Sequence, residues 1–452
     1  MRRLACLSLL PLALFPGCTC GDRTAPTTPP ASAASTSASA SAGAASSASP
    51  AASVAPSNVL DPGVFSAPIG AARSSKQDVV AGLVAAEHLV RVVGVVGGKP
   101  AWGVNALRDV TWAPDAEVRV LSAGDAGVVV VWHGQHAGKT GRTLVIVGPH
   151  GELRGEPMDV GGGFCATADG LAWIDPGKSG PARVMARSWA EGSPGEALRI
   201  SSDRDPALAC GDHLAFALGD GDDDLTAASF APGSPAKAPT VVVRDADFGE
   251  DDEREHDVYT IGDDLALLRA ASSGALALRT VPHGAGPTPW HRLSHSIPPD
   301  DDVVAVDGDA SASFVVYTHD ADEACPGIGS TAIAVRAIRI DGKTSAETVM
   351  DLAAADCDHA PGPFFVAASS PGGATVGWVE RGTKLAKSAP PITGVALRTW
   401  SAAGPAKKHV DLSADAVADA GCDASGCSFA ALVRPEGGDG MSPEAVRVFA
   451  YP

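Results

Sequence analysis

A short apolar segment recurs seven times along the chain, each time directly after a turn rich in Gly, Asp or Ser. A second candidate strand follows each of the seven, and several of these alternate apolar and polar residues, as half-buried strands do. The seven apolar segments are 128–132, 171–174, 214–218, 265–268, 314–317, 375–379 and 428–433. A period of roughly 40–50 residues, with about four strands per unit and no amphipathic helix, predicts an all-β fold of the β-propeller type, in which stacking covers faces that one unit leaves exposed.

Seven units predict a seven-bladed propeller within residues 61–452, although six to eight blades fit the same pattern. The last unit ends after its third strand, 445–451, so its outer strand must come from elsewhere. We expect residues 101–113 to supply that N-terminal strand and close the ring, since an uncovered strand edge invites aggregation. Residues 61–100 remain as an N-terminal extension, in which 78–97 forms an extra hairpin or part of an eighth blade. A β-sandwich array, or two separate all-β domains, is the alternative fold.

One turn resembles a known propeller repeat. Trp112-Ala-Pro-Asp115 is similar to the Trp-Ser-Pro-Asp-Gly turn of TolB-type propeller repeats, with Ala116 in place of the glycine. The resemblance covers one unit only. It implies a propeller and no particular activity.

The first residues resemble a bacterial lipoprotein signal peptide. Arg2 and Arg3 precede a short apolar run, and Gly17 stands directly before Cys18, which completes a cleavage box over residues 14–18. The resemblance implies that residues 1–17 are removed and that Cys18 takes lipid, so we expect a cell-envelope protein with a membrane anchor. By analogy with enterobacterial sorting, Thr19 after the cysteine favours the outer membrane. Residues 18–60, rich in Ala, Ser and Pro, predict a disordered tether that spans about 35 Å as a coil.

The remaining cysteines predict disulfides. Cys6 leaves with the signal and Cys20 lies in the tether, so six cysteines remain in the body of an exported chain, which favours pairing. The short loop between Cys422 and Cys427 predicts one bond. Cys165–Cys210 and Cys325–Cys357 are our choice among the other pairings. The scattered spacing, without any CxxC, argues against a metal site.

The charge pattern excludes some classes of function. Loss of Arg2 and Arg3 takes the net charge of −19 to about −21, which disfavours nucleic acid as a partner. No GxSxG nucleophile elbow is present, and His291 and His295 lack the glutamate of a zinc HExxH motif. We therefore assign no catalytic residue, metal or cofactor.

We expect a binding or scaffolding propeller with a protein or glycan partner in the envelope. One alternative is a propeller hydrolase acting on glycans, with two channel carboxylates about 5–9 Å apart. The acidic runs 219–225, 245–256 and 300–302 leave a calcium-stabilised adhesin as another.

The lipid anchor is directly testable. Replacing Cys18 by Ala removes the lipid acceptor, so the variant is expected in the soluble fraction while the parent chain sediments with membranes. The matched control is Cys20→Ala, which leaves the cleavage box intact. Fractionation followed by immunodetection measures the effect, and a Cys18→Ala variant that still sediments with membranes would show the anchor assignment to be wrong.

Overall fold

The structure is a computed structural model that describes most residues from Phe65 to Tyr451. Outside the described residues lie 1–64, 113–114, 176–180, 191–192, 203–205, 221–223, 237, 245–255, 271–274, 296, 298–302, 309–310, 325–330, 357–358, 371–372, 383–394, 402–403, 406–409, 413–415, 424–425, 434–444 and 452. Within the described part the chain forms eight antiparallel sheets, numbered here in chain order, and two short 3-10 helices.

Each sheet is built from strands that follow one another in the sequence. Sheet 1 contains β1 (Ser66–Ser74), β2 (Gln77–Val84), β3 (Leu89–Val96) and β4 (Lys99–Arg108), with the helix η1 (Ala85–Glu87) between β2 and β3. Sheet 2 contains β5 (Val110–Thr111), β6 (Glu117–Ser122), β7 (Val128–His136), β8 (Lys139–Val147) and β9 (Met158–Val160), with η2 (Gly124–Ala126) before β7. Sheet 3 contains β10 (Phe164–Ala166), β11 (Gly170–Asp175), β12 (Ala182–Ser188) and β13 (Gly195–Ile200). Sheet 4 contains β14 (Ala207–Cys210), β15 (Ala215–Asp220), β16 (Asp224–Phe230) and β17 (Thr240–Arg244).

The second half of the chain repeats the same order. Sheet 5 contains β18 (His256–Ile261), β19 (Asp264–Ala270), β20 (Leu276–Val281) and β21 (His291–Arg292). Sheet 6 contains β22 (Val303–Gly308), β23 (Ala312–Ala324), β24 (Thr331–Asp341) and β25 (Glu347–Asp356). Sheet 7 contains β26 (His359–Ser370), β27 (Gly373–Gly382), β28 (Val395–Ser401), β29 (Gly404–Pro405) and β30 (Val410–Leu412). Sheet 8 contains β31 (Ala416–Asp423), β32 (Gly426–Val433) and β33 (Ala445–Tyr451).

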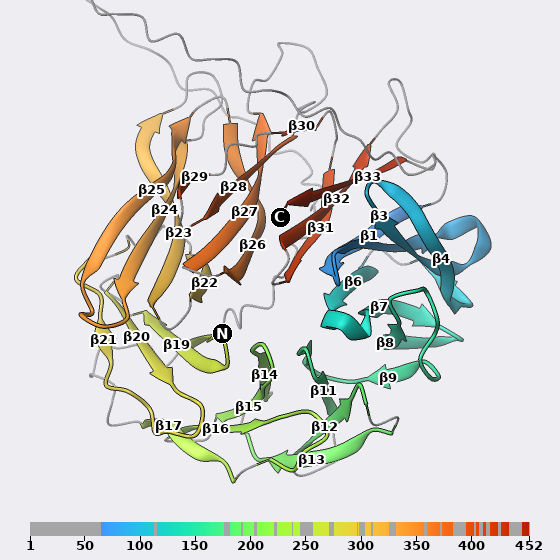
Figure 1. Cartoon of the computed structure of the whole chain (residues 1–452), viewed down its shortest axis with the longest axis horizontal. Coiled ribbons are helices and arrows are strands. Elements are labelled where there is room, and N and C mark those ends of the chain that lie inside the picture. Colours follow the sequence, from blue (N-terminus) through green and yellow to red (C-terminus); the bar gives the residue numbers. More distant parts are fainter. Residues whose placement is uncertain are drawn as a thin grey trace, which may run out of the picture.

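The sheets follow one another around a common centre, as the blades of a β-propeller do (Figure 1). The central residues of their second strands are largely apolar because both faces are buried there. In β7, Val128, Val130 and Trp132 pack against sheet 1, whereas Val129 and Val131 pack against sheet 3. Successive side chains of a strand point to opposite faces, so one strand contributes to two cores. This explains why the recurring segments read as unbroken apolar runs rather than as alternating ones.

Sheet 8 packs against sheet 1. Ala430 of β32 lies in the apolar cluster formed by Ile69, Val80 and other residues of sheet 1. Beside this cluster, the buried Ser428 hydroxyl donates a hydrogen bond to Asp78 Oδ1, and Arg73 Nη1 donates to the same oxygen at 2.7 Å. A buried carboxylate is tolerated here because it has a cationic partner and a hydroxyl donor.

The number of sheets corrects the expected blade count. The prediction of seven units began at residue 128, but residues 78–97 form β2 and β3 of a four-stranded sheet, so the described residues contain eight sheets. The second strand of this first sheet follows residue 76, and the next second strand follows residue 127, an interval like those between the other units. Residues 78–97 thus belong to a four-stranded sheet of their own rather than to an extra hairpin.

The predicted closing strand is wrong. Most of the predicted closing segment, 101–113, belongs to β4 (Lys99–Arg108), which pairs with β3 of its own sheet. The next two strand residues, Val110 and Thr111, pair with β7 of sheet 2. The alternating pattern correctly indicated a half-buried strand, but alternation does not specify which neighbour the strand joins.

The Asp78 contact predicts a large change in stability from a small substitution. Asp78→Asn removes the negative charge and leaves the guanidinium of Arg73 buried without it, so the free energy of unfolding should fall by about 2–4 kcal/mol. The control is Asp351→Asn, since Asp351 is 69% exposed and its ion pair with Arg336 lies at the surface. Urea unfolding measures both. Equal stability losses in the two variants would contradict a structural role for the buried pair.

Candidate functional site

The turns between the first and second strands of sheets 1 to 5 meet at one end of the molecule. The hydroxyl of Ser74, at the end of β1, donates to the carbonyl oxygens of Gly124 at 2.7 Å and Gly127 at 2.5 Å in the turn of sheet 2. Gly124 in turn lies beside Ala168 in the turn of sheet 3. The turns are therefore held to one another along the row of sheets.

The same row continues through sheets 3, 4 and 5. The backbone N–H of Ala168 donates to the carbonyl of Asp212 at 2.7 Å, and the N–H of Asp212 donates to the carbonyl of Gly262 at 3.3 Å. A Cβ atom on Gly211 would lie 2.2 Å from the Gly262 carbonyl oxygen, so glycine is required for this close approach.

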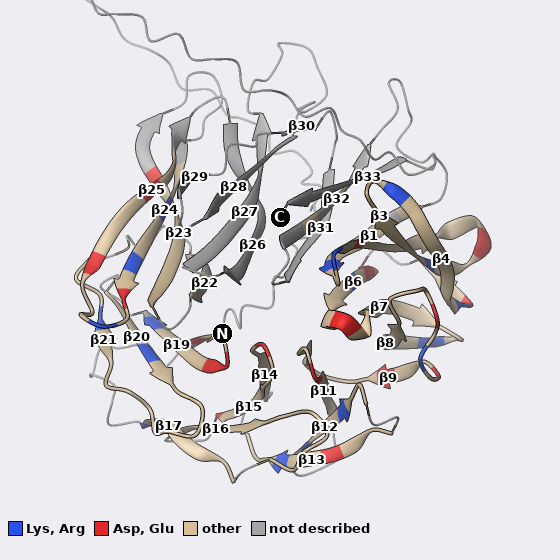
Figure 2. Ribbon diagram, in the orientation of Figure 1, with Lys and Arg blue, Asp and Glu red and all other residues tan. Residues whose placement is uncertain are grey.

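Acidic side chains project from these turns, and we call this set the acidic rim. Figure 2 shows Asp and Glu at several strand tips that face the centre of the molecule, including the tips of β11 and β14 and the helix η2. The members of the acidic rim are Asp125, Asp169, Asp212, Asp263 and Asp264. Of these, Asp125, Asp169 and Asp212 are exposed, and Lys76 in the turn of sheet 1 is an exposed basic residue in the same row.

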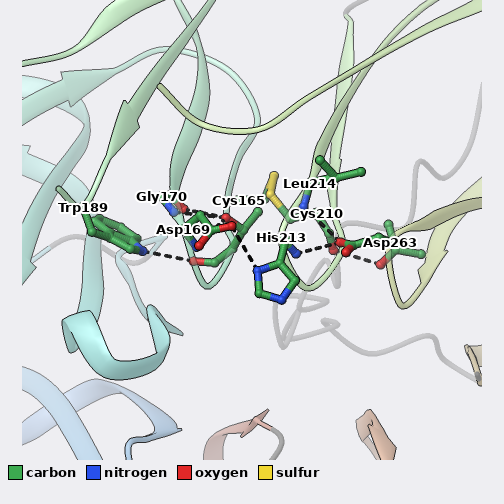
Figure 3. The surroundings of a disulfide bond; sticks show 10 residues. Cys165, Asp169, Gly170, Trp189, Cys210, His213, Leu214 and Asp263 are labelled. Carbon is green, nitrogen blue, oxygen red and sulfur yellow. Dashed lines mark hydrogen bonds and ion pairs between the residues drawn. A yellow bond between two sulfur atoms is a disulfide. The ribbon is translucent and has the colours of Figure 1, made fainter. Parts of the chain in front are cut away.

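His213 links three neighbouring turns of the acidic rim (Figure 3). Its backbone N–H donates to Asp263 Oδ1 at 2.7 Å, and its ring Nδ1 lies 3.0 Å from Asp169 Oδ2. The Leu214 N–H also donates to Asp263 Oδ1, at 3.1 Å. Asp263 is thus fixed by two backbone amides of the preceding turn, in sheet 4. Asp169, by contrast, keeps more than half of its side-chain surface open to solvent.

A disulfide lies directly beside this part of the acidic rim (Figure 3). Cys165 of β10 and Cys210 of β14 are bonded, with 5.7 Å between their Cα atoms, so the inner strands of sheets 3 and 4 are joined covalently. The predicted Cys165–Cys210 pairing is confirmed. Closing a loop of this length should contribute about 4 kcal/mol in the loop-entropy view. The bond therefore fixes two consecutive turns relative to each other.

A second polar cluster lies between the outer strands of sheets 5 and 6. Glu347 of β25 has a side chain that is 6% exposed, and its carboxylate accepts hydrogen bonds from the N–H and the hydroxyl of Ser294 at 2.7–3.0 Å. His291 Nε2 lies 2.8 Å from one carboxylate oxygen and His295 Nδ1 lies 3.1 Å from the other. Burial alone would raise the pKa of Glu347, but the hydrogen bonds from Ser294, His295 and His291 outweigh it and lower the pKa to about 2.

This cluster has the composition of a Ser-His-Glu triad but not its geometry. Catalytic relay requires the histidine to contact the serine through one ring nitrogen and the acid through the other. Here His295 Nδ1 faces both the Ser294 hydroxyl at 3.2 Å and Glu347, and that hydroxyl itself donates to Glu347. The arrangement holds a buried carboxylate between two sheets and does not activate the serine.

The structure tests only part of the sequence-based site assignments. Cys18, Cys325 and Cys357 lie outside the described residues. The backbones of Cys422 and Cys427 are directly opposite each other in the β31–β32 pair, a separation that suits a disulfide, although the bond itself stays a prediction.

Further observations concern two histidines, metal-binding groups and apolar helices in the described part of the chain. His133 and His136 lie in β7. Among the described residues no group of three His, Cys, Asp or Glu is placed to hold a metal ion. No helix in the same residues is long and apolar enough to cross a membrane.

Sequence reasoning missed the acidic rim and Glu347. The aspartates of the rim were visible as turn residues in GDAG, TADG, CGDH and IGDD, yet only the stacking of sheets brings them together. Glu347 stands 52 residues beyond His295, and no spacing rule connects them.

The Glu347 cluster predicts a pH-dependent stability. Because the pKa is lowered from 4.5 to about 2 on folding, the ionised carboxylate stabilises the fold above pH 4.5, and this contribution is lost as the pH falls toward 2. Glu347→Gln should lower the free energy of unfolding by roughly 2–3 kcal/mol at pH 7, with the difference shrinking below pH 4.5. Urea unfolding at pH 7, 5, 4 and 3 tests this, with Asp351→Asn as control. A difference that does not change with pH would contradict the assignment.

Comparison with known proteins finds similarity to propeller structures. No family model matches the chain, and no curated protein sequence matches it. The propeller domain of the trilobed protease from Pyrococcus furiosus has 10% identity and a TM-score of 0.46, over 75% of this chain and 94% of that one. The BP39L lectin from Burkholderia pseudomallei has 13% identity and a TM-score of 0.42, over 76% and 99%.

A prolyl endopeptidase structure shows a similar relationship, with 14% identity, a TM-score of 0.39 and coverage of 70% of this chain. The chain spans about half the length of that endopeptidase, 53%. At these identities the likeness concerns the fold alone.

Proposed function

We propose that the chain is a non-catalytic binding propeller of the cell envelope, anchored through lipid on Cys18, whose acidic rim binds a positively charged segment of a protein partner. The observation that carries this proposal is the convergence of exposed Asp125, Asp169 and Asp212 from three consecutive turns that are hydrogen-bonded or packed together. Loops on a rigid scaffold are where binding residues are commonly placed. The disulfide beside the rim supports such rigidity.

Charge favours a cationic partner. Side-chain carboxylates of neighbouring turns sum to a negative potential over distances within a Debye length, which is about 8–10 Å at physiological salt. The whole chain carries a net charge of −19, so its long-range field points the same way. Complementary fields raise association rates and exclude acidic competitors.

Binding is favoured over glycan hydrolysis by the surroundings of the rim carboxylates. A general acid in a glycosidase is usually held protonated by an apolar environment. Asp125, Asp169 and Asp212 instead lie exposed on turns, and Asp263 is occupied by two backbone amides. The Glu347 cluster also lacks the geometry of an activated nucleophile. The calcium-stabilised adhesin gains no support from the geometry of the rim.

Neutralising the rim tests the proposal. The triple variant Asp125→Asn, Asp169→Asn, Asp212→Asn removes three negative charges from one surface, and octalysine serves as the probe in calorimetric titrations. We expect affinity to fall about tenfold or more, with a strong dependence on salt, because the contact is largely electrostatic.

The matched control removes three charges elsewhere, as Glu87→Gln, Asp159→Asn, Asp351→Asn, at side chains that are 54%, 71% and 69% exposed. It should change octalysine affinity no more than about twofold. Equal losses in the two triple variants would assign the effect to total charge and overturn the rim as the site. Failure of the parent chain to bind octalysine at low salt would overturn the choice of a cationic partner.

A further inference from the structure

A histidine lies against the acidic rim at the point where three turns meet (Figure 3). The side chain of His213 is 58% exposed, and its Nδ1 lies 3.0 Å from Oδ2 of Asp169, whose side chain is 54% exposed. Because an ionised carboxylate only accepts hydrogen bonds, the His213 Nδ1 carries a proton and donates it to Asp169. The other ring nitrogen, Nε2, then holds a lone pair, and it points away from Asp169 (Figure 3).

The turns around His213 contribute acidic side chains and no basic one within the described residues. Its own turn contributes Asp212, the turn of sheet 3 contributes Asp169, and the turn of sheet 5 contributes Asp263 and Asp264. In this part of the structure none of the four carboxylates forms an ion pair with Lys or Arg. A proton on the His213 ring would therefore add positive charge to a surface whose negative charge is otherwise uncompensated.

The backbone of His213 is held in place on both sides. Its N–H and that of Leu214 donate to Asp263 Oδ1 at 2.7 and 3.1 Å. Three residues earlier, Cys210 is bonded to Cys165 of the neighbouring sheet. Protonation of the ring would thus change the charge of the acidic rim while the turn keeps its position.

We propose that His213 makes the acidic rim sensitive to pH, so that the rim binds a cationic segment when the ring is neutral and releases it when the ring is protonated. This inference rests on the binding function proposed above for the acidic rim. A proton taken up from solvent at Nε2 converts the hydrogen bond between His213 and Asp169 into an ion pair, and no bond within the protein is broken. The charge of Asp169 is then compensated by its own neighbour rather than by a lysine or arginine of the partner.

The range between pH 5.5 and pH 8 isolates this change. Histidine side chains ordinarily change charge within it, whereas aspartate side chains ordinarily stay ionised and lysine side chains stay cationic. The range also lies above pH 4.5, below which the stabilising contribution of Glu347 begins to be lost. Binding can therefore be compared at the two ends of the range with the fold intact and with the charge of a lysine probe unchanged.

Calorimetric titration of the full chain with N-acetyl-octalysine at low salt tests the proposal, since the blocked terminus of this probe does not titrate. We expect the parent chain to bind at least about threefold more weakly at pH 5.5 than at pH 8, because one unit charge about 6 Å from a bound ammonium changes affinity by roughly this factor in water. His213→Gln keeps a side-chain donor but cannot take up a proton. Its affinities at the two pH values should therefore agree closely.

The matched control is His283→Gln. His283 is an exposed histidine in the loop after β20, and it contacts Asp264 Oδ1 through its backbone N–H at 2.9 Å. This variant should lose as much affinity at pH 5.5 as the parent chain does.

The outcomes separate the switch from the binding function. A His213→Gln variant that loses as much affinity at pH 5.5 as the parent would overturn the switch, because other histidines would then be responsible. Equal binding of the parent at both pH values would overturn the switch and leave the binding function standing. Absence of binding by the parent at either pH would overturn the proposed function itself.

Nuclear magnetic resonance of the parent chain gives a second measurement that does not depend on a histidine variant. The ring C–H signal that Asp169→Asn displaces at pH 8 identifies His213, since this ring contacts Asp169. The pH midpoint of that signal in the parent chain should coincide with the midpoint of the loss of affinity. Two clearly different midpoints would show that His213 is not the switch.

Discussion

Face-to-face packing of each sheet against two neighbours is the constraint on which the rest of the structure depends. Odd and even residues of one strand enter different cores, so β7 contributes valines to the contacts with both sheet 1 and sheet 3. Both faces are then largely apolar. One sheet alone leaves both apolar faces exposed to water, so each sheet depends on its two neighbours for stability.

The row of sheets brings the turns together, and the turns produce the surface that we assign to binding. Each turn is short and rich in Asp or Gly because it must reverse the chain while approaching the next turn closely, as Gly211 approaches Gly262. Hydrogen bonds from Ala168 to Asp212 and from Asp212 to Gly262 then fix the spacing of the carboxylates. Structural demands on the turns thus supply much of the rigidity that a binding surface requires.

Polar clusters at the contacts between sheets have a different role. The Asp78–Ser428–Arg73 group and the Glu347–Ser294–His295 group each hold a buried carboxylate with donors from another sheet. Apolar packing is tolerant of small sliding movements, whereas a buried charge must meet its donors. These groups specify how neighbouring sheets are aligned, and only the first lies where the two ends of the described fold meet.

The sequence by itself determined the all-β class, the repeat and the strand-turn order, because these depend on local periodicity and turn chemistry. The Cys165–Cys210 bond was one choice among the possible pairings of six cysteines, and the tertiary structure shows that these two are joined. Only the tertiary structure decided that 78–97 belongs to a complete first sheet and that the strand at 101–108 stays with its own hairpin. Strand pairing partners, the acidic rim and the donors to Glu347 all depend on contacts between residues distant in the chain. Local pattern specifies which side of a strand is buried, but the identity of the neighbour is settled by the stacking of whole sheets.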